Sequence, residues 1–317
     1  MTASVAAGLS GDSGWILTAA TLVVAGLLLV PGWIVGRSAR LAALPSLAVA
    51  PALSSAIIAA AEILAHTLAL PWLPWGWAVI AGLTAVLALM ARLLVGTPPE
   101  RARRAASPGR AEWAILAAGL TVAVAVPAGV ILSVLPGPGY PAQVFDATFH
   151  LNAVAAIREG GNASMLGGLS ALYSGRAVYY PTVWHGVVAL APGSPAPVST
   201  AGVLALTAVV WPLSLLGLFA RATGLDATRA SETDRVHRRQ RTCAVAAVLA
   251  LSAAVVGFPL LPMTALAVWP YALSVAGLPG VLVLYDLLRQ ETASWRLRLV
   301  LILLALAAAG GVVAAHG

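Results

Sequence analysis

The feature that most constrains this chain is a series of long apolar runs, each close to the length that crosses a bilayer. A transmembrane helix needs about 20 mostly apolar residues to span roughly 30 Å of hydrocarbon. The sequence therefore predicts an all-α, polytopic transmembrane helical bundle of about eight spans. The second span contains two prolines, so we expect it to be kinked or to begin as an interfacial turn. The eight runs cover Trp15–Gly36, Leu41–Leu70, Trp77–Val95, Trp113–Leu135, Val198–Phe219, Thr242–Leu261, Val268–Leu288 and Leu297–His316.

The composition supports a membrane protein and excludes soluble classes. Of 317 residues, 60% are hydrophobic and 9% are charged, whereas a soluble domain has about a quarter of its residues charged. Soluble enzymes, nucleic-acid binders and disordered chains are therefore excluded. The net charge of +7 does not indicate nucleic-acid binding, because the charges lie in short clusters between the apolar runs. We expect membrane lipids, and no nucleic acid, among its partners.

The positions of the basic residues predict the orientation. All 18 basic side chains are arginines. With the N-terminus outside, only Arg158 and Arg176 fall on the outer side, as the positive-inside rule requires. We therefore expect a multi-pass plasma-membrane protein in which residues 1–317 form one integral membrane domain. Its last span reaches Gly317 without a polar flank, which is expected of the front part of a longer protein.

One extracytoplasmic loop, residues 136–199, is long enough to carry chemistry, because long loops in compact proteins are usually functional or disordered. It is too apolar and aromatic for disorder. Its first part, FDATFHLNAVAAIREGG, predicts a short interfacial helix with Asp146 at the N-cap and Gly160 and Gly161 as the stop. Asp146 and His150, four residues apart, would lie on one side of this helix. The second part predicts a return toward the bilayer, with His185 near a helix start.

Two motifs in this loop carry a family resemblance. They are D-x-x-x-H-L-N-A-V at Asp146–Val154 and Y-P-x-x-W-H at Tyr180–His185. The chain resembles an actinobacterial family of multi-spanning envelope proteins of unassigned function and, more distantly, the GT-C glycosyltransferases, which use polyprenyl-phosphate sugars as donors. In that superfamily an acidic residue of an extracytoplasmic loop is the catalytic base or a metal or acceptor contact, and Asp146 matches it. The acidic loop follows the fourth span here, whereas in GT-C enzymes it usually follows the first.

The resemblance implies sugar transfer at the outer leaflet. Asp146 would accept the proton of an acceptor hydroxyl, and the leaving lipid phosphate would need a guanidinium partner. The implied catalytic residues are Asp146, His150 and His185. The two histidines would either donate hydrogen bonds or, together with Asp146, ligate a divalent cation, and the resemblance leaves the metal unknown. The implied substrate-binding residues are Arg158, Glu159, Arg176, Tyr179, Tyr180 and Trp184.

Structural roles remain open for the same residues. In this alternative, Asp146 is simply an N-cap and the two histidines are interfacial side chains. Arg158 and Glu159 are then solvated charges at a helix end. Tyr180 followed by proline also fits a simple turn.

Glu62 and His66 form an intramembrane polar pair near the outer end of the second span. A charged side chain at the middle of a span costs about 2.5 to 3.5 kcal/mol on insertion scales, so we expect a partner, a proton relay or a water-filled cavity, or a pair that closes on itself. The leading hypothesis is a polyprenyl-phosphate-dependent glycosyltransferase. The alternatives are a transporter or flippase for a lipid-linked or small substrate, and a non-catalytic scaffold for envelope assembly.

Overall fold

The structure is a computed structural model that describes residues 11–96, 108–135, 137, 139–140, 144–225, 232–291 and 294–316. Four of the predicted cytoplasmic arginines, Arg101, Arg103, Arg104 and Arg229, lie outside these residues. The described residues form helices joined by turns, with one isolated antiparallel bridge between Leu166 and Tyr179 and no strand. The predicted all-α architecture is confirmed.

Seven continuous helices in the described residues are long and apolar enough to cross a membrane. The chain is therefore a multi-pass membrane protein. The fifth of these helices is continuous but changes its winding, with the π-helical segment η4 between α7 and α8. The seven are α1 (Gly11–Ser38), α2 (Ala43–Thr67), α3 (Trp72–Val95), α4 (Arg110–Val134), the unit of α7 (Pro195–Leu204), η4 (Ala205–Val210) and α8 (Trp211–Ala222), α11 (Trp269–Gln290) and α12 (Trp295–His316).

The predicted sixth span is broken. Helix α9 (Glu232–Ser252) is followed by a kinked segment, η5 (Val256–Leu260), in which Phe258 is extended, and by α10 (Leu261–Met263). The segment Val256–Met263 is bent by 49° relative to the preceding helix. Pro259 lies inside η5, where it removes a backbone donor and prevents a straight continuation. The number of spans is eight if this bent pair crosses the membrane as one unit.

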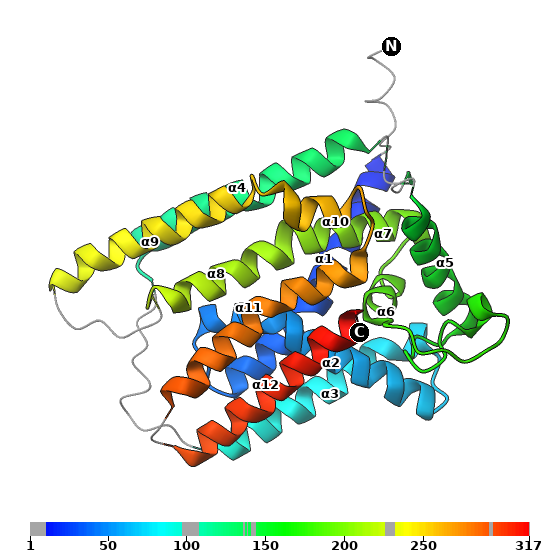
Figure 1. The fold of residues 1–317 in the computed structure, drawn as a ribbon, viewed down its shortest axis with the longest axis horizontal. Helices are drawn as coiled ribbons and strands as arrows, with labels where there is room; N and C mark the ends of the chain where they lie inside the picture. Colours follow the sequence, from blue (N-terminus) through cyan, green and yellow to red (C-terminus); the bar gives the residue numbers. More distant parts are fainter. Residues whose placement is uncertain are drawn as a thin grey trace, which may run out of the picture.

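Helix α2 is the central element, because α1, α3, α8, α11 and α12 all pack against it (Figure 1). It begins at Ala43, and Pro45 falls in its first turn, where no intrahelical N–H bond is required. Small residues allow the close packing around it. A Cβ atom at Gly311 of α12 would lie 2.0 Å from the carbonyl oxygen of Ala52, so these two helices touch backbone to backbone.

The two ends of the bundle differ in chemistry. Figure 1 shows α5 (Phe145–Gly160) and α6 (Val183–Ala189) side by side at one end. Ion pairs that tie neighbouring helices together lie at the opposite end, where Arg221 Nε contacts Asp286 at 2.7 Å and Arg238 Nε contacts Glu112 at 3.0 Å. The long loop and these arginines are thus separated along the helix axes, as the predicted topology requires.

Candidate functional site

Helix α5 forms where the sequence predicts it and ends as predicted. Gly161 follows its last residue in the left-handed conformation, with φ of 65°, which a glycine adopts at little cost. The predicted N-cap is wrong by two positions, because Val144 is the N-cap and Asp146 lies in the first turn. A carboxylate in the first turn interacts favourably with the helix dipole, and the Asp146 side chain remains exposed.

One face of α5 packs on the protein instead of lying free on the lipid surface. This face is covered by α6 and α7, and it consists of Ala147, His150, Ala153, Val154 and Ile157. The sequence predicts that His150 shares one side of the helix with Asp146, but Asp146 is exposed and His150 is buried. Its imidazole points into the protein and is 5% exposed.

His150 and His185 meet as a hydrogen-bonded pair. His150 Nδ1 lies 2.8 Å from His185 Nε2, and His185 is fully buried in α6. One of these two nitrogens must carry the hydrogen, so the other nitrogen of His150, Nε2, is a donor in one tautomer and an acceptor in the other. The rings of Phe149, Tyr180 and Trp269 surround the pair.

Burial keeps both imidazoles neutral near neutral pH. It lowers the pKa of His150 to about 4, and the nearby carboxylate of Asp146 only partly opposes this shift. Burial and the adjacent His150 ring lower the pKa of His185 well below its ordinary value. The neutral pair therefore acts through hydrogen bonding.

Asp146 and His150 line a common pocket with a volume of about 210 Å³. It lies where α5, the segment before α6, the start of α11 and the end of α12 come together. Figure 1 shows the same convergence at one end of the bundle. Its walls are Asp146, Phe149, His150, Tyr180, Pro181, Val268, Pro270, Tyr271 and His316.

Tyr180 is one of the residues that line this pocket. Burial, together with the neighbouring Tyr173 and Asp146, raises the pKa of Tyr180 to about 12, so its hydroxyl stays protonated and can donate a hydrogen bond. Tyr179, by contrast, is 54% exposed and is not part of the pocket wall.

Two polar residues of the pocket wall were not among the candidates from the sequence. Tyr271 and His316 come from α11 and α12, and their rings pack edge to face with centroids 5.4 Å apart. Two features of the sequence pointed to these residues. His316 lies on the predicted outer side, and Tyr271 belongs to the run Trp269–Tyr271 at the predicted outer boundary. Neither signal indicates which loop residues they meet.

Arg158 has a structural role in this arrangement. Its Nε donates to the carbonyl of Ala189 at 3.1 Å, one terminal nitrogen donates to Ala191 at 2.6 Å, and the other donates to the carbonyl of Gly193. The guanidinium thus holds the chain that leaves α6. Of the two arginines predicted to bind a phosphate, Arg176 is the exposed one.

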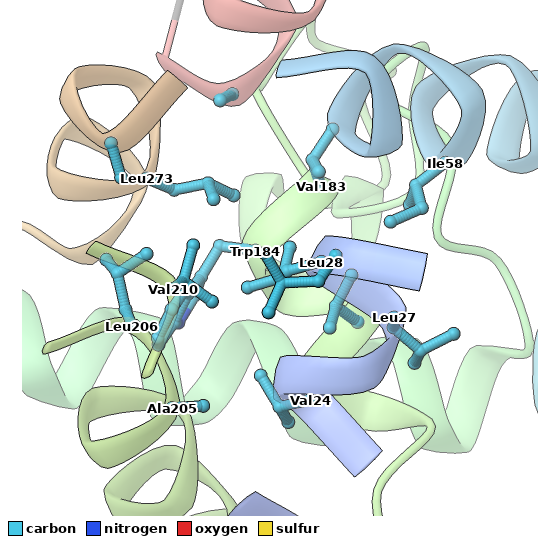
Figure 2. Close-up of a cluster of buried hydrophobic side chains, with 14 of the residues drawn as sticks. Val24, Leu27, Leu28, Ile58, Val183, Trp184, Ala205, Leu206, Val210 and Leu273 are labelled. Atoms are coloured by element: carbon cyan, nitrogen blue, oxygen red, sulfur yellow. The ribbon is translucent and has the colours of Figure 1, made fainter. Parts of the chain in front are cut away.

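The remaining candidates lie away from the pocket. Glu159 is exposed at the end of α5. Trp184 is fully buried, and Figure 2 shows it among Leu28, Leu206 and Val210 in the core. Its indole is enclosed by apolar side chains and has no open face on which a sugar could stack.

The alternative in which Asp146, His150 and His185 ligate a divalent cation finds no support in this geometry. His150 and His185 bind each other through one nitrogen each, and His185 is not in the pocket wall. Across the described part of the chain, no three His, Cys, Asp or Glu side chains gather as metal ligands would.

Glu62 and His66 have different surroundings. Glu62 is 1% exposed, and its Oε2 accepts a hydrogen bond from Thr182 Oγ1 at 2.9 Å. His66, one turn further along α2, is exposed. The sequence predicts that a buried Glu62 needs a compensating partner. That partner is the hydroxyl of Thr182, from the loop of residues 136–199.

Comparison with known proteins yields one family. No curated protein and no solved structure matches the chain. The sequence profile of DUF6541, described as a family of unknown function, matches residues 25–317, and the chain therefore belongs to this family.

Proposed function

We propose that the protein is a membrane glycosyltransferase that moves a sugar from a polyprenyl-phosphate donor to an envelope acceptor at the outer leaflet. The supporting observation is that Asp146, His150 and Tyr180 converge on one pocket at the end of a membrane-spanning bundle. The distant GT-C resemblance of the motif that begins at Asp146 agrees with this proposal.

The reaction follows from the groups in the pocket. The acceptor oxygen attacks the anomeric carbon of the sugar, and the exposed carboxylate of Asp146 accepts the proton that this oxygen loses. The bond between the anomeric carbon and the phosphate oxygen breaks, and its electron pair leaves with the lipid phosphate. The Tyr180 hydroxyl and the neutral His150 ring supply hydrogen bonds that orient the substrates. The donor chain would remain in the surrounding lipid.

The test uses two carboxylates on one helix. In membranes that contain the protein, transfer of radiolabelled sugar from polyprenyl-phosphate donors to envelope acceptors is measured for Asp146→Asn and for Glu159→Gln. We expect Asp146→Asn to abolish transfer, because a carboxamide cannot accept the proton. Glu159→Gln, which changes an exposed carboxylate outside the pocket, should retain activity. Near-normal transfer by Asp146→Asn would exclude this role for Asp146.

Proton-coupled transport is the second candidate, and the buried Glu62 favours it. Intramembrane carboxylates often take up protons in transporters. In proteoliposomes this function predicts a substrate flux that depends on a proton gradient and is lost in Glu62→Gln. It also predicts that the flux survives in Asp146→Asn.

A further inference from the structure

Glu62 connects a membrane span to the short helix that carries His185. Its carboxylate Oε2 accepts the hydrogen bond of Thr182, which is the N-cap residue of α6. The other oxygen, Oε1, is buried and has no hydrogen-bonding partner among the described residues. Glu62 therefore bonds to Thr182 through Oε2, while Oε1 is buried without a hydrogen bond.

The packed oxygen lies directly against the backbone of α6. A Cβ atom at Gly186 would come within 2.0 Å of Glu62 Oε1, so only glycine fits this position without moving the carboxylate. Thr182 and Gly186 are four residues apart and share one face of the helix. The carboxylate thus contacts the N-cap and the first turn of α6.

A second side chain holds the same turn. Trp72, the first residue of α3, is 1% exposed, and its Nε1 donates to the carbonyl oxygen of Gly186 at 2.9 Å. His185 lies inside the turn that Glu62 and Trp72 hold. A helix of seven residues has little intrinsic stability, so its orientation depends on contacts of this kind.

We propose that Glu62 is a positioning residue that fixes α6 so that His185 holds the His150 ring toward the pocket. The catalytic consequence rests on the function proposed above, whereas the geometric claim does not. Glu62 acts on α6 through Thr182 and Gly186. His185 then passes this constraint to His150 through the 2.8 Å bond between the rings. Loss of the contact lets α6 turn and breaks the pairing of the two imidazoles.

The test observes the histidine pair directly. The full chain contains five histidines, so histidine-selective nitrogen labelling in lipid bilayers gives few ring signals, and single substitutions assign them by NMR. We expect Glu62→Ala and Thr182→Val to lose the through-bond nitrogen correlation between the His150 and His185 rings. Glu62→Gln and Thr182→Ser keep an acceptor and a hydroxyl, so they should retain it.

Controls separate positioning from general damage. Thr207→Val removes a buried hydroxyl that has no partner in the described chain and lies in η4, so it should leave the ring correlation unchanged. Thr182→Val preserves side-chain volume and decides the question if Glu62→Ala fails to fold. An unchanged correlation in folded Glu62→Ala or Thr182→Val would overturn the proposal.

A kinetic measurement distinguishes this proposal from the proposed function. If the protein transfers sugar, Glu62→Ala should lower kcat by roughly tenfold to a hundredfold with little change in KM, and Glu62→Gln should restore most of it. A variant that changes KM alone would contradict a positioning role. If the wild-type protein transfers no sugar, the proposed function fails, and the ring correlation still tests the role of Glu62.

Discussion

Acidification is expected to destabilise the folded protein through His150. Its imidazole has an ordinary pKa of 6.5, and burial lowers the pKa to about 4 in the folded state. The unfolded chain therefore takes up this proton at a higher pH than the folded chain does. The contribution of His150 to stability is complete above pH 6.5 and is lost as the pH falls from 6.5 toward about 4. At about 1.4 kcal/mol per pKa unit, the loss is roughly 3 kcal/mol.

The measurement is the free energy of unfolding in mixed detergent micelles, followed by tryptophan fluorescence. Wild type and His150→Asn are compared at about pH 7.5 and about pH 4.5. Groups away from the histidine pair titrate in both proteins and cancel, so the difference reports His150 together with its effect on His185. Between these pH values, we expect the free energy of unfolding to fall further in the wild type than in the variant. The extra loss should be most of the roughly 3 kcal/mol. His66→Asn, which changes an exposed histidine, should follow the wild type. Equal losses in wild type and His150→Asn would refute the argument.

Three further predictions test packing, the loop anchor and topology. Gly311→Ala should destabilise the bundle by about 1–3 kcal/mol in the same unfolding assay, because its Cβ meets the backbone of α2, whereas Gly310→Ala, with open space around it, should be nearly neutral. Arg158→Gln should lower stability by about 1–2 kcal/mol through lost carbonyl bonds, and Arg176→Gln should not. A cysteine at the exposed Ser174, in a chain without its native cysteine, should react with an impermeant maleimide in intact cells; labelling only after permeabilisation would reverse the predicted orientation.

The spans could be predicted because they depend on local composition. A run of about 20 apolar residues must cross the bilayer wherever it lies in the chain, and seven such helices are found near the predicted positions. The break between α9 and α10 was missed. Its signals, Gly257 and Pro259, occur within an apolar run, and hydropathy does not register the loss of a backbone donor. The short α5 helix was found because glycines mark its end.

The pocket could be predicted only in part. The loop motifs identified Asp146 and His150, which share one helix. They did not identify Tyr271 and His316, which reach the same pocket from spans more than 100 residues away in the sequence. Such contacts depend on how the spans pack, and span packing is set by small residues such as Gly311 and not by hydropathy. Arg158 was interpreted as a phosphate ligand because sequence alone does not show the carbonyl groups that surround it.

Glu62 indicates why loop and spans are best regarded as one unit. The sequence required a compensating partner for a carboxylate in a span, and the nearest candidate in the chain was His66. The structure pairs it with Thr182, 120 residues further along. A carboxylate enclosed in this way is tolerated only while α6 stays in place, and α6 in turn depends on the carboxylate. The geometry at the pocket is therefore determined as much by α2 as by the loop that carries His185.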